Sequence, residues 1–139
     1  KWVEENKLHF AHWFTVDDLV YLKRGGRISG APAAIATIFN IKPVLHVDNE
    51  GRLIPVAKVR GRKASLRAIA EKVQETMLDR PDQTLFISHG DSEEDARLVA
   101  EMIKERTGLE LQVLNFVGPV IGSHSGPGTI AVFYIGSER

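Results

Sequence analysis

Three short segments combine charged or titratable side chains with glycines that let the backbone turn sharply. They are Lys23–Arg27, Lys58–Lys63 and Gly122–Gly128. Arginine suits anion recognition because its planar guanidinium can hold both oxygens of a carboxylate or a phosphate. We therefore expect Arg27 and Arg60 to bind an anion. The alternatives are a helix end whose cations favour the dipole, for Arg27, and a solvated charged turn, for Arg60.

The segment Gly122–Gly128 is the strongest local indication of a functional site. Glycine at three of its seven positions and proline at another predict a rigid, tightly turned loop. His124 could bind a carboxylate there, directly or through water, or act as a general base. Ser123 and Gly126 are grouped with it as ligand-binding candidates, and a structural histidine bonded to a nearby carbonyl is the alternative. A serine hydrolase is a poor match, since His124 stands where the nucleophile elbow requires serine.

Other kinds of chemistry find little support. The chain has no cysteine, which removes disulfides, zinc–thiolate sites and a thiol nucleophile. His9, His12 and His46 lack metal-ligand spacing, so we expect no metal site. We find no phosphate loop or dinucleotide fingerprint and expect no cofactor. His89 is interpreted as part of a plain turn.

The composition predicts one soluble domain over residues 1–139. With 43% apolar residues, the chain is long enough for one core and too short for two comfortable ones. It has no run of about 18 apolar residues and no signal peptide, so we expect a cytoplasmic protein without a membrane span. It opens at Lys1 in a helical-looking segment with no cap, and we expect the front of the protein to be missing.

Charge is balanced overall but not along the chain. Residues 1–70 hold 12 Lys and Arg against 6 Asp and Glu, whereas residues 71–139 hold 6 against 12. The basic half can attract an anionic ligand or an acidic partner. The balanced total argues against generic nucleic-acid binding, so we expect no nucleic acid as a partner.

The elements that position the candidates are predicted from caps and periodicity. Residues 9–14 are predicted to be a strand, and Thr15 to cap a helix that Gly25–Gly26 end. Ser29 is predicted to cap a short helix over residues 30–39.

Strands and helices continue in the rest of the chain. Residues 41–47 and 53–59 are predicted to form a hairpin. Residues 63–78 are predicted to be a helix, because apolar residues recur at three- and four-residue steps. The remaining elements are expected as strand 84–88, helix 92–107, strand 109–116, loop 118–128 and strand 129–135. Hairpins mixed with strand–helix–strand units predict an α+β fold, a mixed β-sheet with helices packed on one face.

Four ordered motifs resemble the DegV family of bacterial fatty-acid-binding proteins. They are residues 14–29 (FTVDDLVYLKRGGRIS), 40–45 (NIKPVL), 59–64 (VRGRKA) and 118–129 (GPVIGSHSGPGT). The resemblance implies two α/β lobes and a long-chain fatty acid such as palmitate. The acyl tail would run inside the C-terminal lobe, and the carboxylate would sit between the lobes. This chain is similar to the C-terminal lobe of such a protein, with the N-terminal lobe missing.

The resemblance also implies roles for the candidate residues. Arg27, Arg60 and His124 fall on motif residues that line the headgroup region or face a partner fatty-acid kinase. The Thr and Ser that hold the carboxylate in the family belong to the first lobe and have no counterpart here. Because the chemistry would belong to the kinase, we expect a non-catalytic carrier in lipid metabolism and not an enzyme.

The acyl tail should supply most of the affinity. Burying about fourteen methylenes at ~0.8 kcal/mol each offers on the order of 11 kcal/mol, whereas each hydrogen bond to a carboxylate adds roughly 1.5–3 kcal/mol. Alanine and isoleucine on the predicted helix 30–39 could line the tail or belong to an ordinary core; they are Ala31, Ala33, Ala34, Ile35 and Ile38.

Three other readings stay open at this point. The chain could be an acyl or phosphoryl transferase with His124 as base and Arg60 as anion clamp. It could be a folded lobe that binds nothing alone. An exposed apolar surface between the lobes could also make this chain a homodimer.

Overall fold

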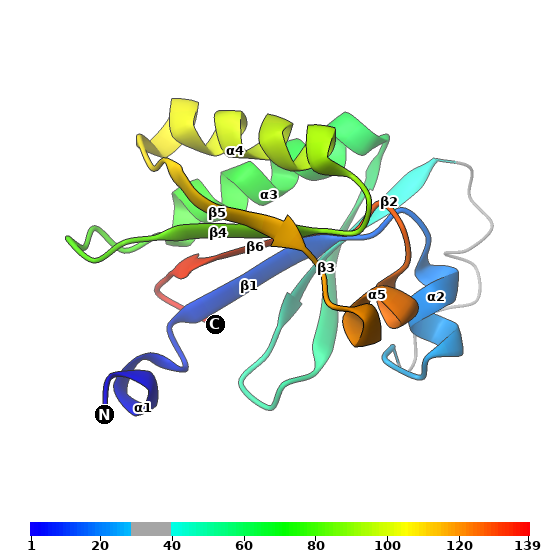
Figure 1. Cartoon of the computed structure of the whole chain (residues 1–139), viewed down its shortest axis with the longest axis horizontal. Coiled ribbons are helices and arrows are strands. Elements are labelled where there is room, and N and C mark those ends of the chain that lie inside the picture. The colour runs from blue at the N-terminus through cyan, green and yellow to red at the C-terminus, as the bar shows by residue number, and fades with distance from the viewer. Residues whose placement is uncertain (29–39) are drawn as a thin grey trace.

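The computed structural model describes residues 1–28 and 40–139. Helices and strands are mixed along these two ranges (Figure 1). In chain order they are α1 (Trp2–Asn6), β1 (Phe10–Thr15), α2 (Leu19–Arg24), β2 (Ile41–Val47), β3 (Leu53–Arg60), α3 (Arg62–Thr76), β4 (Leu85–His89), α4 (Glu93–Thr107), β5 (Leu111–Phe116), α5 (Pro119–Ser125) and β6 (Ile130–Ile135).

The strands form one six-stranded sheet in the order β3-β2-β1-β6-β4-β5. All neighbouring strands are antiparallel except β4 and β5. The hairpin of β2 and β3 closes at Gly51, whose φ of 79° favours glycine. β4 and β5 are parallel because α4 carries the chain back between them. Both the predicted hairpin and the predicted strand–helix–strand unit are confirmed.

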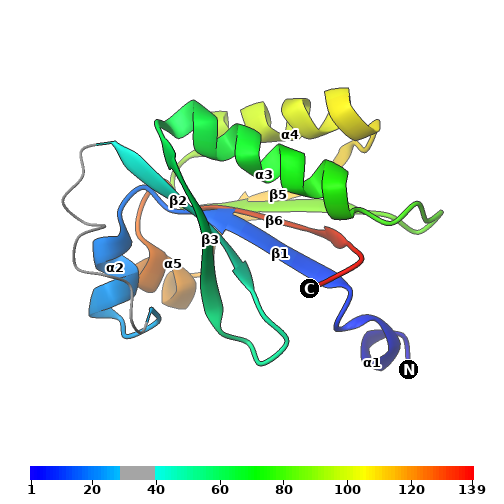
Figure 2. The ribbon, with the colours of Figure 1, turned by 180° about the vertical axis from the view of Figure 1, so that it is seen from behind.

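α3 and α4 lie side by side over one face of the sheet (Figures 1 and 2). Their inward side chains pack with those of the central strands into the main core, where Leu66, Val99 and Val132 are fully buried. α2 packs against the opposite face at one end of the sheet, where its side chains meet Phe14 and Leu45. The predicted α+β fold is confirmed, with the two long helices on a single face.

The boundaries of α4 follow from ordinary capping chemistry. Its first turn holds Glu93, Glu94 and Asp95, whose carboxylates favour the positive end of the helix dipole. Gly108 ends it in the left-handed conformation, with a φ of 74°. The helix therefore occupies the predicted place, and the acidic turn lies at the edge of the sheet where β4 ends.

The glycine-rich segment differs from its prediction, because residues 119–125 form the helix α5 and not a loop. Pro119 occupies the first helical position, where its missing N–H costs nothing. Gly126, with a φ of 81°, ends the helix. The proline and glycine that predicted a loop are therefore the start and stop of a helix.

Two further predictions around α2 have different outcomes. Thr15 is not a cap, because it is buried in β1 and donates its hydroxyl to the carbonyl of Pro43 at 2.7 Å. Asp18 caps α2 instead, and its Oδ1 accepts the N–H of Val20 at 2.8 Å. The helix predicted over residues 30–39 lies outside the described residues.

Candidate functional site

The candidate residues gather at one edge of the sheet. β1, β3, β4 and β5 end at this edge, and β2 and β6 begin there. The strand pairing shows this directly, since Thr15 and His89 each pair with Ile130, and Arg60 pairs with Ile41. Loops that leave one edge of a sheet are common places for functional groups.

Arg27 is held at the end of α2 by a Schellman motif. Gly26 is left-handed, with a φ of 67°, and its N–H donates to the carbonyl of Lys23 at 3.1 Å. The N–H of Arg27 donates to the carbonyl of Leu22 at 2.9 Å. The exposed guanidinium then folds back, and Nη1 donates to the carbonyl of Gly25 at 2.6 Å. The two glycines thus turn Arg27 back over the helix end.

His124 lies on α5, which packs against α2 in both ribbon views (Figures 1 and 2). Its imidazole fills the space where a side chain at position 25 would begin. A β-carbon added to Gly25 would overlap Nδ1 of His124 and lie 3.1 Å from its Cγ and Cε1. Arg27 and His124, which are far apart in the sequence, therefore both lie against Gly25.

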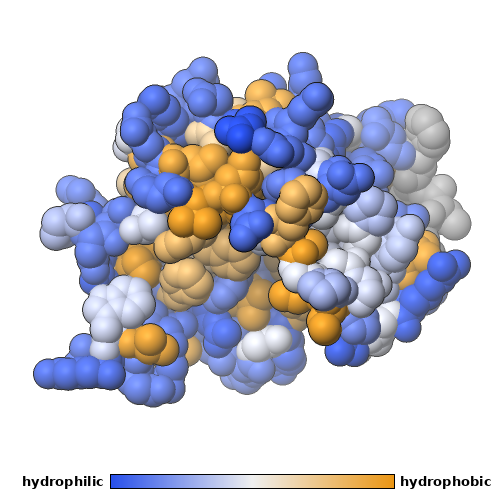
Figure 3. All heavy atoms as spheres, in the orientation of Figure 1, coloured by the Kyte–Doolittle hydropathy of each residue, from blue (hydrophilic) through white to orange (hydrophobic). Residues whose placement is uncertain are grey.

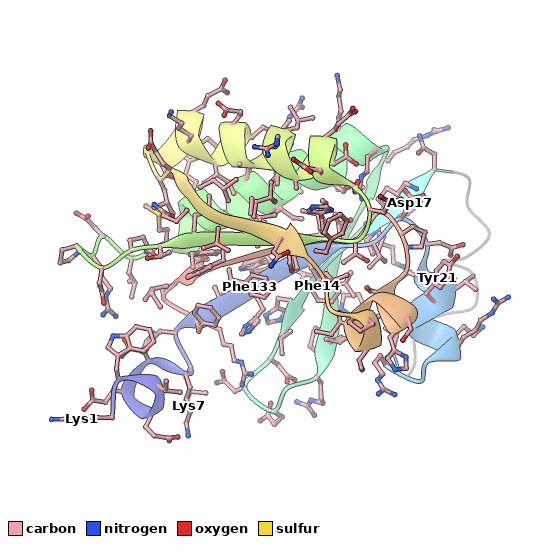
Figure 4. The ribbon with its side chains drawn as sticks, viewed as in Figure 1. Lys1, Lys7, Phe14, Asp17, Tyr21 and Phe133 are labelled. Carbon is pink, nitrogen blue, oxygen red and sulfur yellow. The ribbon has the colours of Figure 1, made fainter. Side chains whose placement is uncertain are left out.

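Gly126 and Ser123 flank His124 in different ways. A β-carbon on Gly126 would lie 2.5–2.9 Å from the ring of Tyr21, which projects from α2 (Figure 4). Only glycine allows α2 and α5 to approach this closely. Ser123 is exposed, and its hydroxyl donates to the carbonyl of Val120 at 2.8 Å. In this conformation its oxygen can accept a further hydrogen bond, but its proton is already used.

Arg60 stands apart from this cluster. It is exposed at the end of β3, the edge strand, whereas Arg27 follows α2 and His124 lies on α5, which packs against α2. The backbone turns directly after it, since Gly61 has a φ of 94° and donates its N–H to the carbonyl of Asn40 at 2.8 Å. The described contacts therefore tie Arg60 and His124 to different elements.

Arg62 is an inward-facing residue that the sequence prediction missed. Its Nε donates to Oδ2 of Asp95 at 2.7 Å, and its Nη2 donates to the carbonyl of Gly128 at 2.6 Å. The side chain is only 20% exposed and joins the start of α3 to the start of α4 and to the turn after α5. The feature of the sequence that could have identified Arg62 is its position two residues after Arg60, where β3 ends and α3 begins.

An acidic cavity of about 380 Å³ lies at the β4–α4 end of the same edge. It is lined by His89, Phe116 and the carboxylates of Asp91, Glu93, Glu94 and Asp95. His89 is 98% buried, accepts the N–H of Ser92 at 3.1 Å and packs against Phe116 with the rings tilted by 49° and their centroids 4.5 Å apart. The carboxylates repel an anion, so this cavity is unsuited to a fatty-acid headgroup.

The cluster around Gly25 has the chemistry of an anion site. Arg27 carries a permanent charge, and His124 offers a ring nitrogen that can donate to an oxygen directly or through water. Among residues 1–28 and 40–139, no group of three or more His, Asp or Glu is placed to hold a metal ion.

Apolar side chains are exposed along β5 and α5. Figure 3 shows apolar surface over this side of the molecule. The exposed residues are Val113, Phe116, Val120 and Ile121, and the last three are more than 60% exposed. Contiguous exposed apolar surface is typical of contact surfaces in proteins. Within the described part of the chain, no helix is both long enough and apolar enough to cross a membrane.

Comparison with known proteins agrees with this fold. The sequence profile described as "Uncharacterised protein, DegV family" matches residues 1–137. A DegV domain-containing protein of Clostridium perfringens is 46% identical over 138 residues, which are 99% of this chain and 47% of that protein. The chain thus spans about half the length of the curated relatives it matches.

Solved structures give the same result. A fatty acid binding DegV family protein from Streptococcus agalactiae superimposes with a TM-score of 0.83 and is 30% identical, over 96% of this chain and 47% of that one. A DegV family protein from Ruminococcus gnavus, described with vaccenic acid, gives 0.81 and 27%, over 94% and 46%. Profile, relatives and fold together show that this chain belongs to the DegV family.

Proposed function

We propose that this chain holds a long-chain fatty acid as a non-catalytic carrier and presents its carboxylate to a separate fatty-acid kinase. The observation that carries the proposal is the meeting of Arg27 and His124 at Gly25. It places a guanidinium and an imidazole beside one glycine, from two motifs of a family whose members include a fatty acid binding protein and one described with vaccenic acid. The carrier works in the cytoplasm and takes an acid such as palmitate.

The carboxylate lies beside Arg27 and His124 in this proposal. The exposed guanidinium of Arg27 keeps donors free besides the one used on Gly25, because the group has five N–H donors. His124 adds a directional contact, while Ser123 and Gly126 border the site on the same helix end. Arg60, separate and exposed, faces the partner kinase or the outer part of the headgroup region.

The acyl tail runs on the α2 side of the sheet. The core beneath α3 and α4 is filled, since Leu66, Val99 and Val132 have no exposed surface. The other face carries a smaller cluster, in which Val16 and Leu45 are also fully buried while Phe14 and Ile28 keep 8–9% exposure. The apolar residues expected to line the tail come directly after Ile28 in sequence and lie outside the described residues; they are Ala31, Ala33, Ala34, Ile35 and Ile38.

The whole protein has a first lobe that completes the headgroup site. The chain spans 47% of its Clostridium perfringens relative, which leaves room for a domain of similar size. The exposed apolar residues of β5 and α5 lie beside the candidate site and suit a contact with such a lobe. Without it, the same surface can bring two copies of this chain together, which light scattering at high concentration would detect.

The first test is extraction of the purified full-length protein and of this chain, with mass spectrometry of the lipid. We expect near-stoichiometric long-chain acid in the full-length protein. Arg27→Ala and His124→Ala should lower its retention, whereas Arg67→Ala, which removes an exposed arginine from α3, should not. The proposal fails if the full-length protein carries no fatty acid and takes none up.

A second test separates a carrier from an enzyme. The loaded protein should form acyl phosphate from ATP only when a fatty-acid kinase is added. A transferase with His124 as base and Arg60 as anion clamp would instead turn over alone, and His124→Ala would abolish that turnover. Turnover without a kinase would overturn the carrier assignment.

A further inference from the structure

We propose that Arg62 is a positioning residue for the headgroup site: it holds the turn after α5 and thereby keeps His124 against Gly25. The inference rests on the proposed function for its ligand but on the described contacts for its geometry. Arg62 itself lies away from the carboxylate, and it acts through the backbone of Gly128.

The fork of Arg62 fixes two partners at once. Nε binds Asp95 on α4 at 2.7 Å, and Nη2 binds the carbonyl of Gly128 at 2.6 Å. Ser92 supports the arrangement, because its hydroxyl donates to the same oxygen of Asp95 at 3.0 Å. A planar guanidinium held by a carboxylate in this way cannot rotate without losing one of its bonds. The carbonyl of Gly128 is therefore held in a set direction.

Gly128 is clamped on its other sides as well. Its N–H donates to the carbonyl of Gly90 at 2.7 Å, and a β-carbon on it would lie 2.8 Å from Cβ of Asp17. Asp17 precedes α2, as Figure 4 shows, and is itself bound by Lys42 at 2.5 Å. The turn thus fits into a closed space between β4, α2 and α3, and Arg62 supplies the side-chain bond that holds it there.

The same turn determines where α5 ends. The hydroxyl of Thr129 donates to the carbonyl of Gly126 at 2.7 Å, and Gly126 caps the helix through the carbonyl of Gly122 at 2.8 Å. α5 is only seven residues long and is largely exposed on its outer side. Its position depends on α2 and on its two ends. A shift of Gly128 therefore reaches His124, which lies two residues before Gly126.

Arg62→Lys in the full-length protein tests the inference, because it keeps the charge and removes the fork. The matched control is Arg67→Lys, an exposed position on the same helix. We expect retention of palmitate to fall about tenfold in Arg62→Lys, the effect of one misplaced hydrogen bond to a charged group. Retention of hexadecanol, which has the same tail and no carboxylate, should stay unchanged. Equal losses for the two lipids would mean a merely structural role and would overturn the inference.

A measurement without lipid keeps this inference separate from the proposed function. The ring Hε1 signal of His124 is identified in the proton NMR spectrum by its loss in His124→Ala. We expect this signal to move in Arg62→Lys and to stay in place in Arg67→Lys. An unmoved signal refutes the positioning role, even if the protein binds fatty acid. A moved signal in a protein that binds no lipid supports the positioning role and refutes the carrier assignment instead.

Discussion

Replacing Gly25 with alanine is a direct test of the contact between α2 and α5. Gly25 has φ −76° and ψ −2°, a conformation that alanine adopts freely. The new β-carbon would nevertheless overlap Nδ1 of His124. The substitution therefore acts on the imidazole of His124 and leaves the backbone at position 25 unstrained.

Two opposing effects set the expected change in the free energy of unfolding. Overpacking costs about 1–3 kcal/mol, and the half-buried ring of His124 can swing outward, which favours the lower end. Loss of glycine's freedom in the unfolded chain stabilises by about 0.4–1 kcal/mol. We expect a small net destabilisation by Gly25→Ala alone. In a His124→Ala background only the second effect remains, so the same change should stabilise the protein.

The assay is a double-mutant cycle by urea unfolding, with Gly26→Ala as the matched control. Gly26 has a φ of 67° and nothing within 4 Å of an added β-carbon, so alanine there should cost about 1–2 kcal/mol whether or not His124 is present. The coupling between Gly25→Ala and His124→Ala should exceed 1 kcal/mol in size. A coupling below about 0.5 kcal/mol, the range of independent sites, would refute the described contact.

The cycle also bears on lipid binding. Because Gly25→Ala moves His124 without removing it, fatty-acid retention should fall toward that of His124→Ala. Retention equal to that of the wild type would mean that displacing the His124 ring does not affect the bound headgroup. His124 would then be a structural histidine.

Three shorter predictions concern other positions. Burial, and secondly the nearby charge of Arg139, lower the pKa of His12 from 6.5, so the folded state binds fewer protons than the unfolded one. The midpoint of urea unfolding should therefore fall as the pH drops below about 6.5, and it should fall less in His12→Phe. Equal slopes of the midpoint against pH in the two proteins would count against this. Gly126→Ala should destabilise by about 1–3 kcal/mol more than Gly108→Ala in thermal unfolding, because both have a positive φ but only Gly126 abuts the ring of Tyr21; equal losses would argue against that contact. Tyr134→Phe should remove a phenol whose pKa is raised to about 12 by burial, so its ultraviolet absorbance titration should lose a component near that pH, and an unchanged curve would contradict the burial.

The sequence predicted most elements because their signals are local. The acidic first turn and the final Gly108 bound α4, and alternating apolar residues mark the hairpin of β2 and β3. α5 shows where local signals mislead. Pro119 and Gly126 are equally typical of a turn and of helix ends, and the packing of α5 against α2 decides between them. That contact joins distant parts of the chain and leaves no local pattern.

The residue types of the candidate site were predictable, but the contacts between residues distant in the sequence were not. Glycine at position 25 was interpreted as a helix stop, yet Gly26 provides the left-handed turn, and Gly25 is small because His124 lies against it. Arg60 was chosen because it ends a strand, and Arg62 was not considered. The inward direction of Arg62 depends on how α3 and α4 pack at their starts, which no local window contains.

The unequal charge of the two halves of the chain places negative and positive side chains at different points along one edge of the sheet. The start of α4 carries four carboxylates, those of Asp91, Glu93, Glu94 and Asp95. Arg62 pairs with Asp95 and Arg97 with Glu93, so two negative charges remain without an ion pair among the described residues. Arg27 lies at the α2 end of the same edge. Two unit charges 4 Å apart interact by roughly 1 kcal/mol in water and about 4 kcal/mol near a protein surface. If the proposed carrier function holds, a fatty-acid carboxylate at this edge should be attracted by Arg27 and repelled by Asp91 and Glu94 at the start of α4.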